Sequence, residues 1–545
     1  MLFFSNLDSG GGEMSKKEWT LMFYFASDNP LAAGIVSQLK SIKQAGFHPE
    51  INVIAQFDPQ AEGAPTHVFE VNLINKLEAA EKYEIGSTAP DVPTLVQDRL
   101  WGEQESHDGG LIKDRIKASL GAEGPRYRPP TPPAGKARTD GKIAELSPRK
   151  SLTRFLEFCR KHYPARRYIL FLLGHGLIVG SDIFLFDEHA TEHSLSLKNL
   201  GKILTDFKNQ IKKDDQSLEL VSFHSCSMSA VEVAYELQGT ANHMLACEGP
   251  AFVGSWPYRQ ILMHVFQNYL DGSDVKTTLR EIFDCCLQNS YDFELAGYSF
   301  DLCLCDLKKV KELTTPLKEL SKALKGGLTD RLAKECILLA HWDAQSYWDE
   351  AFIDIYDFCF RLDQRCAKAK PANSKLQAIQ KASRALRETL EPGDNRLIVR
   401  SQIAGPSYQY SHGLSLFFPW SAPINENFWP NEYEGYKFEK TFWRQFLAQY
   451  FTETMRDPRR SEPRPKGKPA YKPTLVEDLL EEVTTLGRGG QLGVQGSGTL
   501  DDPPGTGKGS SADPTGTDSG PSIKNYPPYT RKPLAKGKKT GKLRE

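Results

Sequence analysis

Two apolar runs with the composition of buried strands end close to residues that can do nucleophilic chemistry. The run 168–173 ends shortly before His175, and the run 218–223 ends shortly before Cys226. In open α/β sheets, sites form outside the carboxyl ends of the strands. We therefore expect the imidazole and the thiol to meet at one edge of a sheet. There the imidazole can take the thiol proton while the sulfur attacks a carbonyl carbon.

Each of these two residues also has a purely structural interpretation. A cysteine at a strand end is commonly a small core residue, and a buried histidine is commonly held by hydrogen bonds. Two observations favour chemistry. A helix expected to start near Ser227 would lower the pKa of the Cys226 thiol, and glycines on both sides of His175 leave room for a substrate backbone.

The sequence segments around these residues resemble those of the clostripain-like cysteine peptidases. The segments that carry the resemblance, in chain order, are 19–29, 172–176, 223–228, 231–237, 246–248, 256–258, 354–358 and 413–419. The resemblance implies a caspase-like αβα sandwich with a mostly parallel central sheet. It also implies a cysteine endopeptidase with His175 and Cys226 as its dyad, in which backbone N–H groups of Gly176 and Cys226 bind the oxyanion.

The substrate pocket implied by the resemblance departs from the family pattern at two positions. Family members carry an acid two residues before the nucleophile and another in the following loop, whereas this chain has His224 and Gly254 there. With Glu248 and Trp256, these residues form the predicted substrate-binding set. A buried cation without a counter-charge is costly, and His224 would itself become cationic at low pH. We therefore expect arginyl and lysyl substrates to be poor.

Composition indicates an ordinary globular protein in the cytoplasm. The net charge of −1 and pI near 6.9 give no signature of nucleic-acid or membrane binding. The start of the sequence lacks the features of a signal peptide, and no apolar run is long enough to span a membrane. The ten cysteines lie mostly in apolar surroundings, which is typical of reduced, buried thiols. The basic run from Lys532 to Arg544 could contact anionic surfaces.

The pattern along the chain predicts an α/β core with additions. Strands are expected at 21–26, 51–58, 67–72, 168–173, 182–186, 218–223, 243–247, 298–304, 396–403 and 413–418. Helices are expected at 31–45, 151–162, 197–211, 228–237, 259–269 and over most of 308–395. The predicted organisation is a disordered N-terminus at 1–18, a peptidase core at 19–307, a helical C-terminal region at 308–455 that returns strands to the core, and a disordered tail at 456–545.

A proline-rich, basic stretch interrupts this core. It forms the end of an insertion at about 85–150 that we expect to be mobile. Family members cleave themselves, and exposed flexible segments are preferred sites of cleavage. The resemblance therefore predicts self-processing within 121–150.

Three other motifs have weaker claims. His189 to His193 spells H-x-x-E-H, but the segment falls in a polar loop rather than on the helix that zinc binding requires. Cys303 and Cys305 alternate along a strand and are better read as two core thiols. The segment 503–510 resembles a phosphate-binding loop, but no predicted strand precedes it, so we do not expect it to bind phosphate. The residues indicate no metal site, and only the family resemblance offers calcium, as a candidate cofactor.

Two alternative functions remain open at this stage. One is a degenerate family member that binds peptides or partners without cleaving them, an idea motivated by the lost acids at His224 and Gly254. Selective labelling of Cys226 by a thiol-reactive probe would count against it. The other is a scaffold that acts through its long tail, in which case deleting the tail, and not mutating Cys226, should abolish function.

Overall fold

The computed structural model describes residues 16–46, 48–58, 66–71, 147–176, 184–188, 190, 192–295, 298–347, 351–420 and 435–455 of the 545-residue chain. The disorder predicted for the tail at 456–545 and the mobility predicted for the insertion therefore concern residues outside these ranges, apart from 147–150. Helix α4 begins at Pro148. Strand β1 begins at Lys17, two residues before the predicted start of the core.

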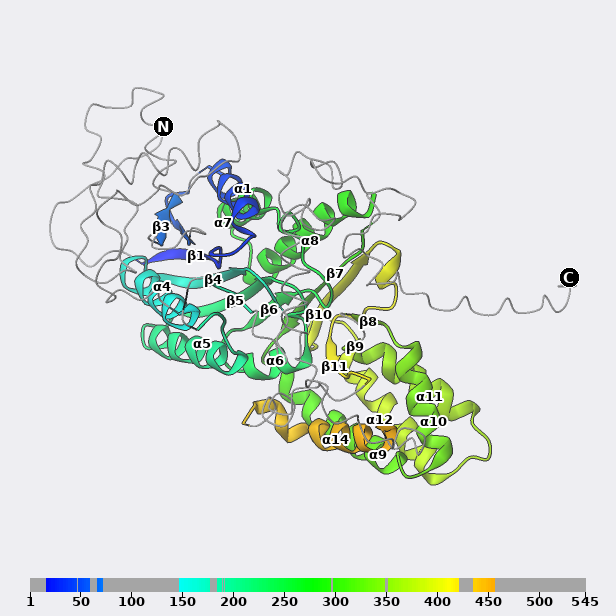
Figure 1. The fold of residues 1–545 in the computed structure, drawn as a ribbon. Coiled ribbons are helices and arrows are strands. Elements are labelled where there is room, and N and C mark those ends of the chain that lie inside the picture. The colour runs from blue at the N-terminus through cyan, green and yellow to red at the C-terminus, as the bar shows by residue number, and fades with distance from the viewer. Residues whose placement is uncertain are drawn as a thin grey trace, which may run out of the picture.

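Eight strands form one mixed sheet at the centre of the molecule (Figure 1). Their bounds are β1 Lys17–Phe25, β2 Ile51–Phe57, β3 His67–Glu70, β4 Ala165–Leu173, β5 Ser217–His224, β6 His243–Ala246, β7 Phe300–Asp306 and β10 Ile398–Ala404. The strand order is β10-β7-β6-β5-β4-β1-β2-β3. Pairing is parallel from β2 through β1, β4 and β5 to β6, and antiparallel at both margins.

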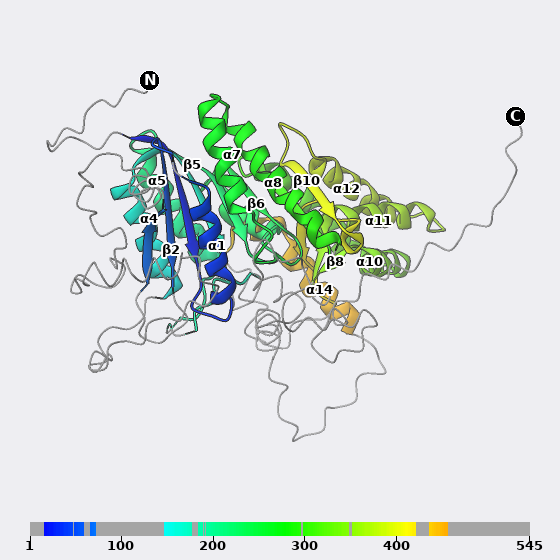
Figure 2. The ribbon, with the colours of Figure 1, turned by 90° about the horizontal axis from the view of Figure 1, so that it is seen from above.

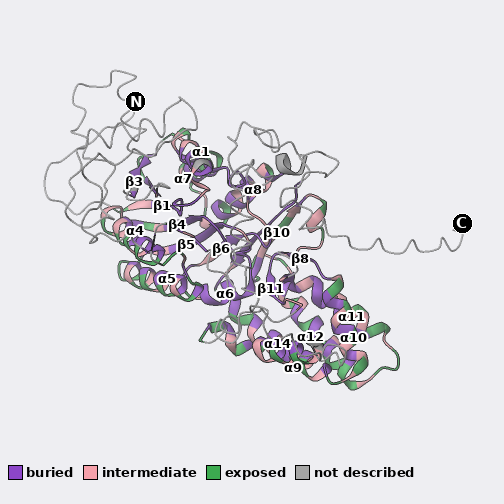
Figure 3. Ribbon diagram, in the orientation of Figure 1, coloured by how far each residue is buried: buried purple, intermediate pink, exposed green. Residues whose placement is uncertain are grey.

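Helices cover both faces of this sheet because the central strands are apolar on both sides (Figure 2). Leu21 and Phe23 point into a core shared with α1 Ala32–Gln44, α7 Tyr258–Leu270 and α8 Val275–Leu295. Met22 and Tyr24 point to the other face, towards α4 Pro148–His162, α5 Leu197–Lys212 and α6 Val231–Leu237. Figure 3 shows the strands buried between these two layers. The αβα sandwich with a mostly parallel sheet is thus confirmed.

The C-terminal region is mostly helical and carries a small sheet of its own. Its elements are 3₁₀ turns at Val310–Leu313, Pro406–Tyr408 and Lys437–Thr441, the helices α9 Thr314–Gly327, α10 Arg331–Asp343, α11 Ile355–Lys368, α12 Ser374–Leu390 and α14 Trp443–Met455, and the strands β8 Ser346–Tyr347, β9 Phe352–Asp354 and β11 Ser415–Phe417. The three strands pair antiparallel in the order β11-β9-β8. Asp330, Asp354 and Asn373 cap the starts of α10, α11 and α12.

Two predicted elements differ from the structure beside the site. The described part of the strand expected at 182–186 is a turn instead. Leu185 has a left-handed φ of 51°, and its N–H donates to the His175 carbonyl, so this segment folds over the end of β4 rather than joining the sheet. The helix expected to start near Ser227 begins only at Val231, because residues 227–230 form an irregular loop.

Candidate active site

Strand register brings the two candidate catalytic residues together. β4 and β5 are parallel neighbours in which Leu173 pairs with His224, so His175 and Cys226 each follow two residues beyond this pair. A Cβ added to Gly176 would lie 1.8 Å from the Cys226 carbonyl oxygen, which shows that the two backbones are in direct contact. The only side chain that fits at position 176 is therefore a hydrogen atom.

The loop that carries Cys226 is held by the neighbouring loop after β6. Ser227 N–H donates to the Gly249 carbonyl at 3.0 Å, and Ser229 N–H donates to the Cys247 carbonyl at 2.9 Å. The N–H of Ala251 donates to Cys226 Sγ at 3.3 Å. Ser227 has a φ of 55°, a conformation that is uncommon outside glycine and is retained where surrounding structure dictates it. These contacts fix where the thiol points.

Cys226 differs from the other cysteines in its exposure. All ten cysteines are free, nine are buried, and Cys226 is partly exposed. The protein packed around the sulfur nevertheless raises the pKa of the thiol to about 11, because burial outweighs the hydrogen bond from the Ala251 N–H. The expectation of a lowered thiol pKa was wrong, since helix α6 starts five residues after Cys226. The resting group is a neutral thiol.

His175 is a neutral imidazole in an apolar setting. It is 2% exposed, its ring meets the edge of Phe186, and burial lowers its pKa to about 4. Within the described residues, Nε2 has no hydrogen-bond partner. Sequence reasoning missed Phe186 and also Asn29, whose side-chain amide donates to the carbonyls of Ala26 and Phe186 at 2.8 Å each. Asn29 thereby ties the segment over His175 to the end of β1.

Two of the predicted substrate-binding residues are packed into the core. His224 is buried, with Nε2 donating to the Phe252 carbonyl at 2.5 Å and Nδ1 accepting from the Tyr258 hydroxyl at 3.0 Å. Its ring stacks on Trp256, which is fully buried and donates to Ser222 Oγ. Burial lowers the His224 pKa to about 3, so the cationic form expected at low pH does not arise until the pH falls to about 3. Both ring nitrogens are already occupied.

The other two predicted substrate-binding residues lie on the loop after β6. The Gly254 carbonyl accepts a hydrogen bond from the Asn289 side chain at 2.7 Å. Glu248 is fully buried, and its Oε2 accepts from the Gly413 N–H at 2.9 Å. Direct substrate contact by any of the four residues stays a prediction. Asp28, an acid three residues after the end of β1, is also buried, and its carbonyl accepts from the Glu188 N–H.

Three buried carboxyl groups meet behind this loop, and sequence reasoning missed two of them. Asp301 and Asp354 join Glu248, and the Asp301 oxygens accept from the N–H groups of Glu248 and Gly249. Calcium takes about six to eight oxygen ligands. With the Asp301 oxygens engaged by backbone donors, the cluster does not fit that ion. Over the described ranges, no three His, Cys, Asp or Glu side chains are grouped to hold a metal.

The weaker motifs of the sequence can be placed in part. Glu192 and His193 lie outside any helix, and His189 falls outside the described residues, as does the segment 503–510. Cys303 and Cys305 are fully buried on β7 with their sulfurs 3.3 Å apart. The prediction of two core thiols on one face is thus confirmed.

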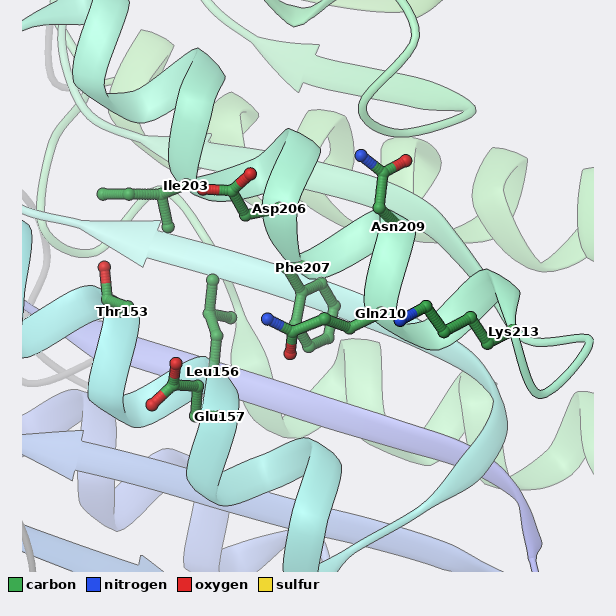
Figure 4. A pocket seen from close by; sticks show the side chains of 9 residues that line it. All are labelled: Thr153, Leu156, Glu157, Ile203, Asp206, Phe207, Asn209, Gln210 and Lys213. Atoms are coloured by element: carbon green, nitrogen blue, oxygen red, sulfur yellow. The ribbon is translucent and has the colours of Figure 1, made fainter.

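A pocket of about 300 Å³ lies between α4 and α5, away from the dyad (Figure 4). Its lining includes Gln210 and Lys213 at the end of α5, which leads into the start of β5. Cys226 follows the opposite end of that strand. This pocket is therefore not part of the candidate active site.

No described helix has the length and apolar character needed to cross a membrane, and the cytoplasmic location stays a prediction.

Comparison with known proteins identifies the family of this chain. A model of the clostripain family matches residues 137–450, more than half of the chain. Clostripain of Hathewaya histolytica is 22% identical over 453 residues, covering 73% of this chain and 74% of that protein.

Two solved structures are also similar. One is an inactive zymogen C11 protease of Parabacteroides distasonis, at 15% identity over 79% of this chain and 100% of that chain, with a TM-score of 0.43. The other is a secreted C11 cysteine protease of Bacteroides thetaiotaomicron in complex with an irreversible peptide inhibitor, at 11% identity over 78% and 99% of the two chains, with a TM-score of 0.46. On the strength of the family match, this chain belongs to the clostripain family.

Proposed function

We propose that the protein is a cysteine endopeptidase whose dyad is Cys226 and His175. The observation that carries the proposal is the register of β4 and β5, which brings a partly exposed thiol and a buried imidazole to adjacent strand ends. Family membership supports the same chemistry. The backbone N–H groups of Gly176 and Cys226 are proposed to bind the oxyanion, because the two backbones are in contact at this point.

The electrostatics favour a neutral dyad that separates charge only during attack. With its pKa lowered by burial, His175 stays uncharged at physiological pH and its ring can accept a proton. As Sγ forms a bond to the peptide carbonyl carbon, the thiol proton passes to the imidazole. The imidazolium then gives that proton to the leaving amine, and water hydrolyses the thioester. Nε2, which has no hydrogen-bond partner among the described residues, is proposed as the atom that takes and returns this proton.

Specificity for uncharged or acidic side chains before the scissile bond is the first expected property. His224 stands where an acid would attract a cation, and it is neutral, buried and fully hydrogen-bonded. We expect a positional-scanning library of peptidyl-aminomethylcoumarins to be hydrolysed, with arginyl and lysyl members at least about tenfold slower than the best neutral ones. Cys226→Ala protein provides the background rate.

The library separates two kinds of failure. If no member is hydrolysed above the Cys226→Ala background, the endopeptidase assignment is wrong and the degenerate, peptide-binding alternative is favoured. Efficient hydrolysis after arginine would leave the assignment standing and would show that another carboxylate supplies the missing charge.

Self-processing within 121–150 is the second expected property. The family relative from Parabacteroides distasonis is described as an inactive zymogen, and the stretch is rich in proline and basic residues, a composition that disfavours a packed core. We expect wild-type protein to cut itself there on ageing, with both pieces held together by the shared sheet, because β1 pairs with β4 across the cut. Intact-mass spectrometry and native gel filtration measure the two outcomes.

Cys226→Ala protein, aged in parallel, is the matched control. Equal cleavage in both samples would identify a contaminating protease. A wild-type chain that stays intact while it hydrolyses the peptide library would remove self-processing from the proposal.

A further inference from the structure

The loop that follows Cys226 is bound to the C-terminal strand β11 by a row of hydrogen bonds. Ser415 N–H donates to the Ser229 carbonyl at 2.9 Å, and Ser229 Oγ donates to the Gly413 carbonyl at 2.5 Å. Further along, Phe417 N–H donates to Glu232 Oε1 at 3.1 Å. β11 therefore holds the nucleophile loop, residues 226–230, in place through these hydrogen bonds.

Glu248 extends this support to the second loop that holds the nucleophile. Its Oε2 accepts from the Gly413 N–H, so Gly413 is bound through its N–H by Glu248 and through its carbonyl by Ser229. Gly413 has a φ of 111°, and a Cβ there would lie 2.7 Å from Cys303 Sγ. The backbone just before β11 is therefore held in one position at Gly413. It couples the C-terminal region to both loops at the thiol.

Asp301 fixes the same loop from the core side. From β7, its two carboxylate oxygens accept from the N–H groups of Glu248 at 2.5 Å and Gly249 at 2.9 Å. The Gly249 carbonyl in turn accepts from the N–H of Ser227, the residue after the nucleophile. A continuous chain of hydrogen bonds therefore runs from Asp301 to the backbone next to Cys226.

These carboxyl groups share a buried, crowded setting. Burial, with Asp354 and Asp301 nearby, raises the pKa of Glu248 well above its usual range. Burial raises the pKa of Asp301 to about 7. The titratable groups that interact with Glu248 are Asp301 and Cys303 on β7, Tyr347 on β8 and Asp354 at the end of β9. Asp357 on α11 and His412 before β11 face Asp354 in turn.

We propose that Glu248 and Asp301 are positioning residues for Cys226, with Glu248 joining the nucleophile loops to β11. The inference rests on the proposed role of Cys226 as the nucleophile. It assigns to the C-terminal region a part in catalysis that is exerted through the backbone of residues 226–230. Neither carboxyl group takes part in proton transfer to the substrate.

A pair of Glu248 variants tests the inference. Glu248→Gln keeps the volume and the acceptor for the Gly413 N–H, so it should lose less of the wild-type kcat than Glu248→Ala does. Glu248→Ala removes the acceptor and leaves a space, so kcat should fall about 10- to 100-fold with KM changed less than about threefold. The rate at which iodoacetamide alkylates Cys226, measured by peptide mass spectrometry, should change in Glu248→Ala and not in Glu248→Gln.

The pH dependence of kcat gives a readout that a packing role would not move. In wild type, rising pH ionises Glu248 beside Asp301 and Asp354 and weakens the link to β11 by repulsion. Glu248→Gln cannot ionise, so the ratio of its kcat to that of wild type should rise as the pH passes upward through the raised pKa of Glu248. Glu248→Ala with wild-type kcat and alkylation rate would overturn the inference.

Asp301→Asn and Ser229→Ala keep the inference testable if Glu248→Ala does not fold. Asparagine retains one acceptor for the two N–H groups, and alanine removes the Ser229 link to the Gly413 carbonyl. Each should lower kcat about tenfold while the unfolding transition stays cooperative. Wild-type kcat in both would count against the inference. Failure of the proposed function itself looks different, because Cys226→Ala would then turn over substrate as fast as wild type.

Discussion

Cys226→Ala is expected to reduce peptide hydrolysis by more than about 10³-fold. The substitution removes the sulfur that forms the thioester with the substrate in the proposed reaction. The fold should survive the substitution. The side chain is partly exposed, and its sulfur accepts from the Ala251 N–H and donates to the Ala251 carbonyl, so the free energy of unfolding should change by about 1 kcal/mol or less. Initial rates on the best library peptide, together with thermal unfolding, measure both quantities.

His175→Ala should be similarly inactive, and the double variant should lose little more than either single one. The nucleophile and the base act in the same step. Once one of them has been removed, that step no longer takes place, so removing the other causes little further loss of rate. Additive losses would mean that the imidazole acts elsewhere. Cys285→Ala is the matched control, because it removes a buried thiol of α8. It should keep full activity and the wild-type rate of iodoacetamide incorporation, whereas Cys226→Ala should lose that incorporation.

The position of the dyad could be predicted from sequence because it depends on a simple rule. Apolar runs that end shortly before His175 and Cys226 become neighbouring parallel strands, and parallel strands deliver their carboxyl ends to one edge. The sandwich itself follows from strands such as β1, which is apolar at both odd and even positions and must therefore be covered on both faces.

The electrostatic state of the dyad could not be predicted in the same way. A helix directly after Cys226 would have lowered the pKa of the thiol. Residues 227–230 instead form a loop that makes hydrogen bonds with Gly249, Cys247 and β11. Those partners lie about 20 to 190 residues away in the chain. Asp301 and Asp354 were missed for the same reason, since only the folded sheet brings them beside Glu248.

The prediction for residue 224 shows how a correct departure from a family pattern can have a different physical meaning. The histidine does remove an acid from the expected pocket position. Its ring, however, stacks on Trp256 and bonds to the Phe252 carbonyl and the Tyr258 hydroxyl. Position 224 therefore contributes to packing behind the nucleophile loop, and the absence of charge there follows from burial rather than from titration.

Gly176→Ala is expected to be as damaging to activity as loss of the nucleophile, and far more damaging to the fold. The added methyl group would lie 1.8 Å from the Cys226 carbonyl oxygen and 2.6 Å from its amide nitrogen. Relief requires the ends of β4 and β5 to move apart, since both obstacles are backbone atoms. Overpacking typically costs about 1 to 3 kcal/mol, and a clash with fixed backbone should exceed that range. Chemical unfolding and kcat on the best library peptide measure the two effects.

Gly326→Ala separates this clash from a general effect of replacing glycine. Gly326 lies in α9, and an added Cβ would meet only the flexible end of Lys375, at 3.4 Å. Alanine in a helix is favoured over glycine by about 1 kcal/mol, so this variant should be slightly more stable than wild type and fully active. Gly176→Ala with wild-type stability and kcat would mean that the backbones of residues 176 and 226 are not in contact. The pairing of His175 with Cys226 would then lose its geometric basis.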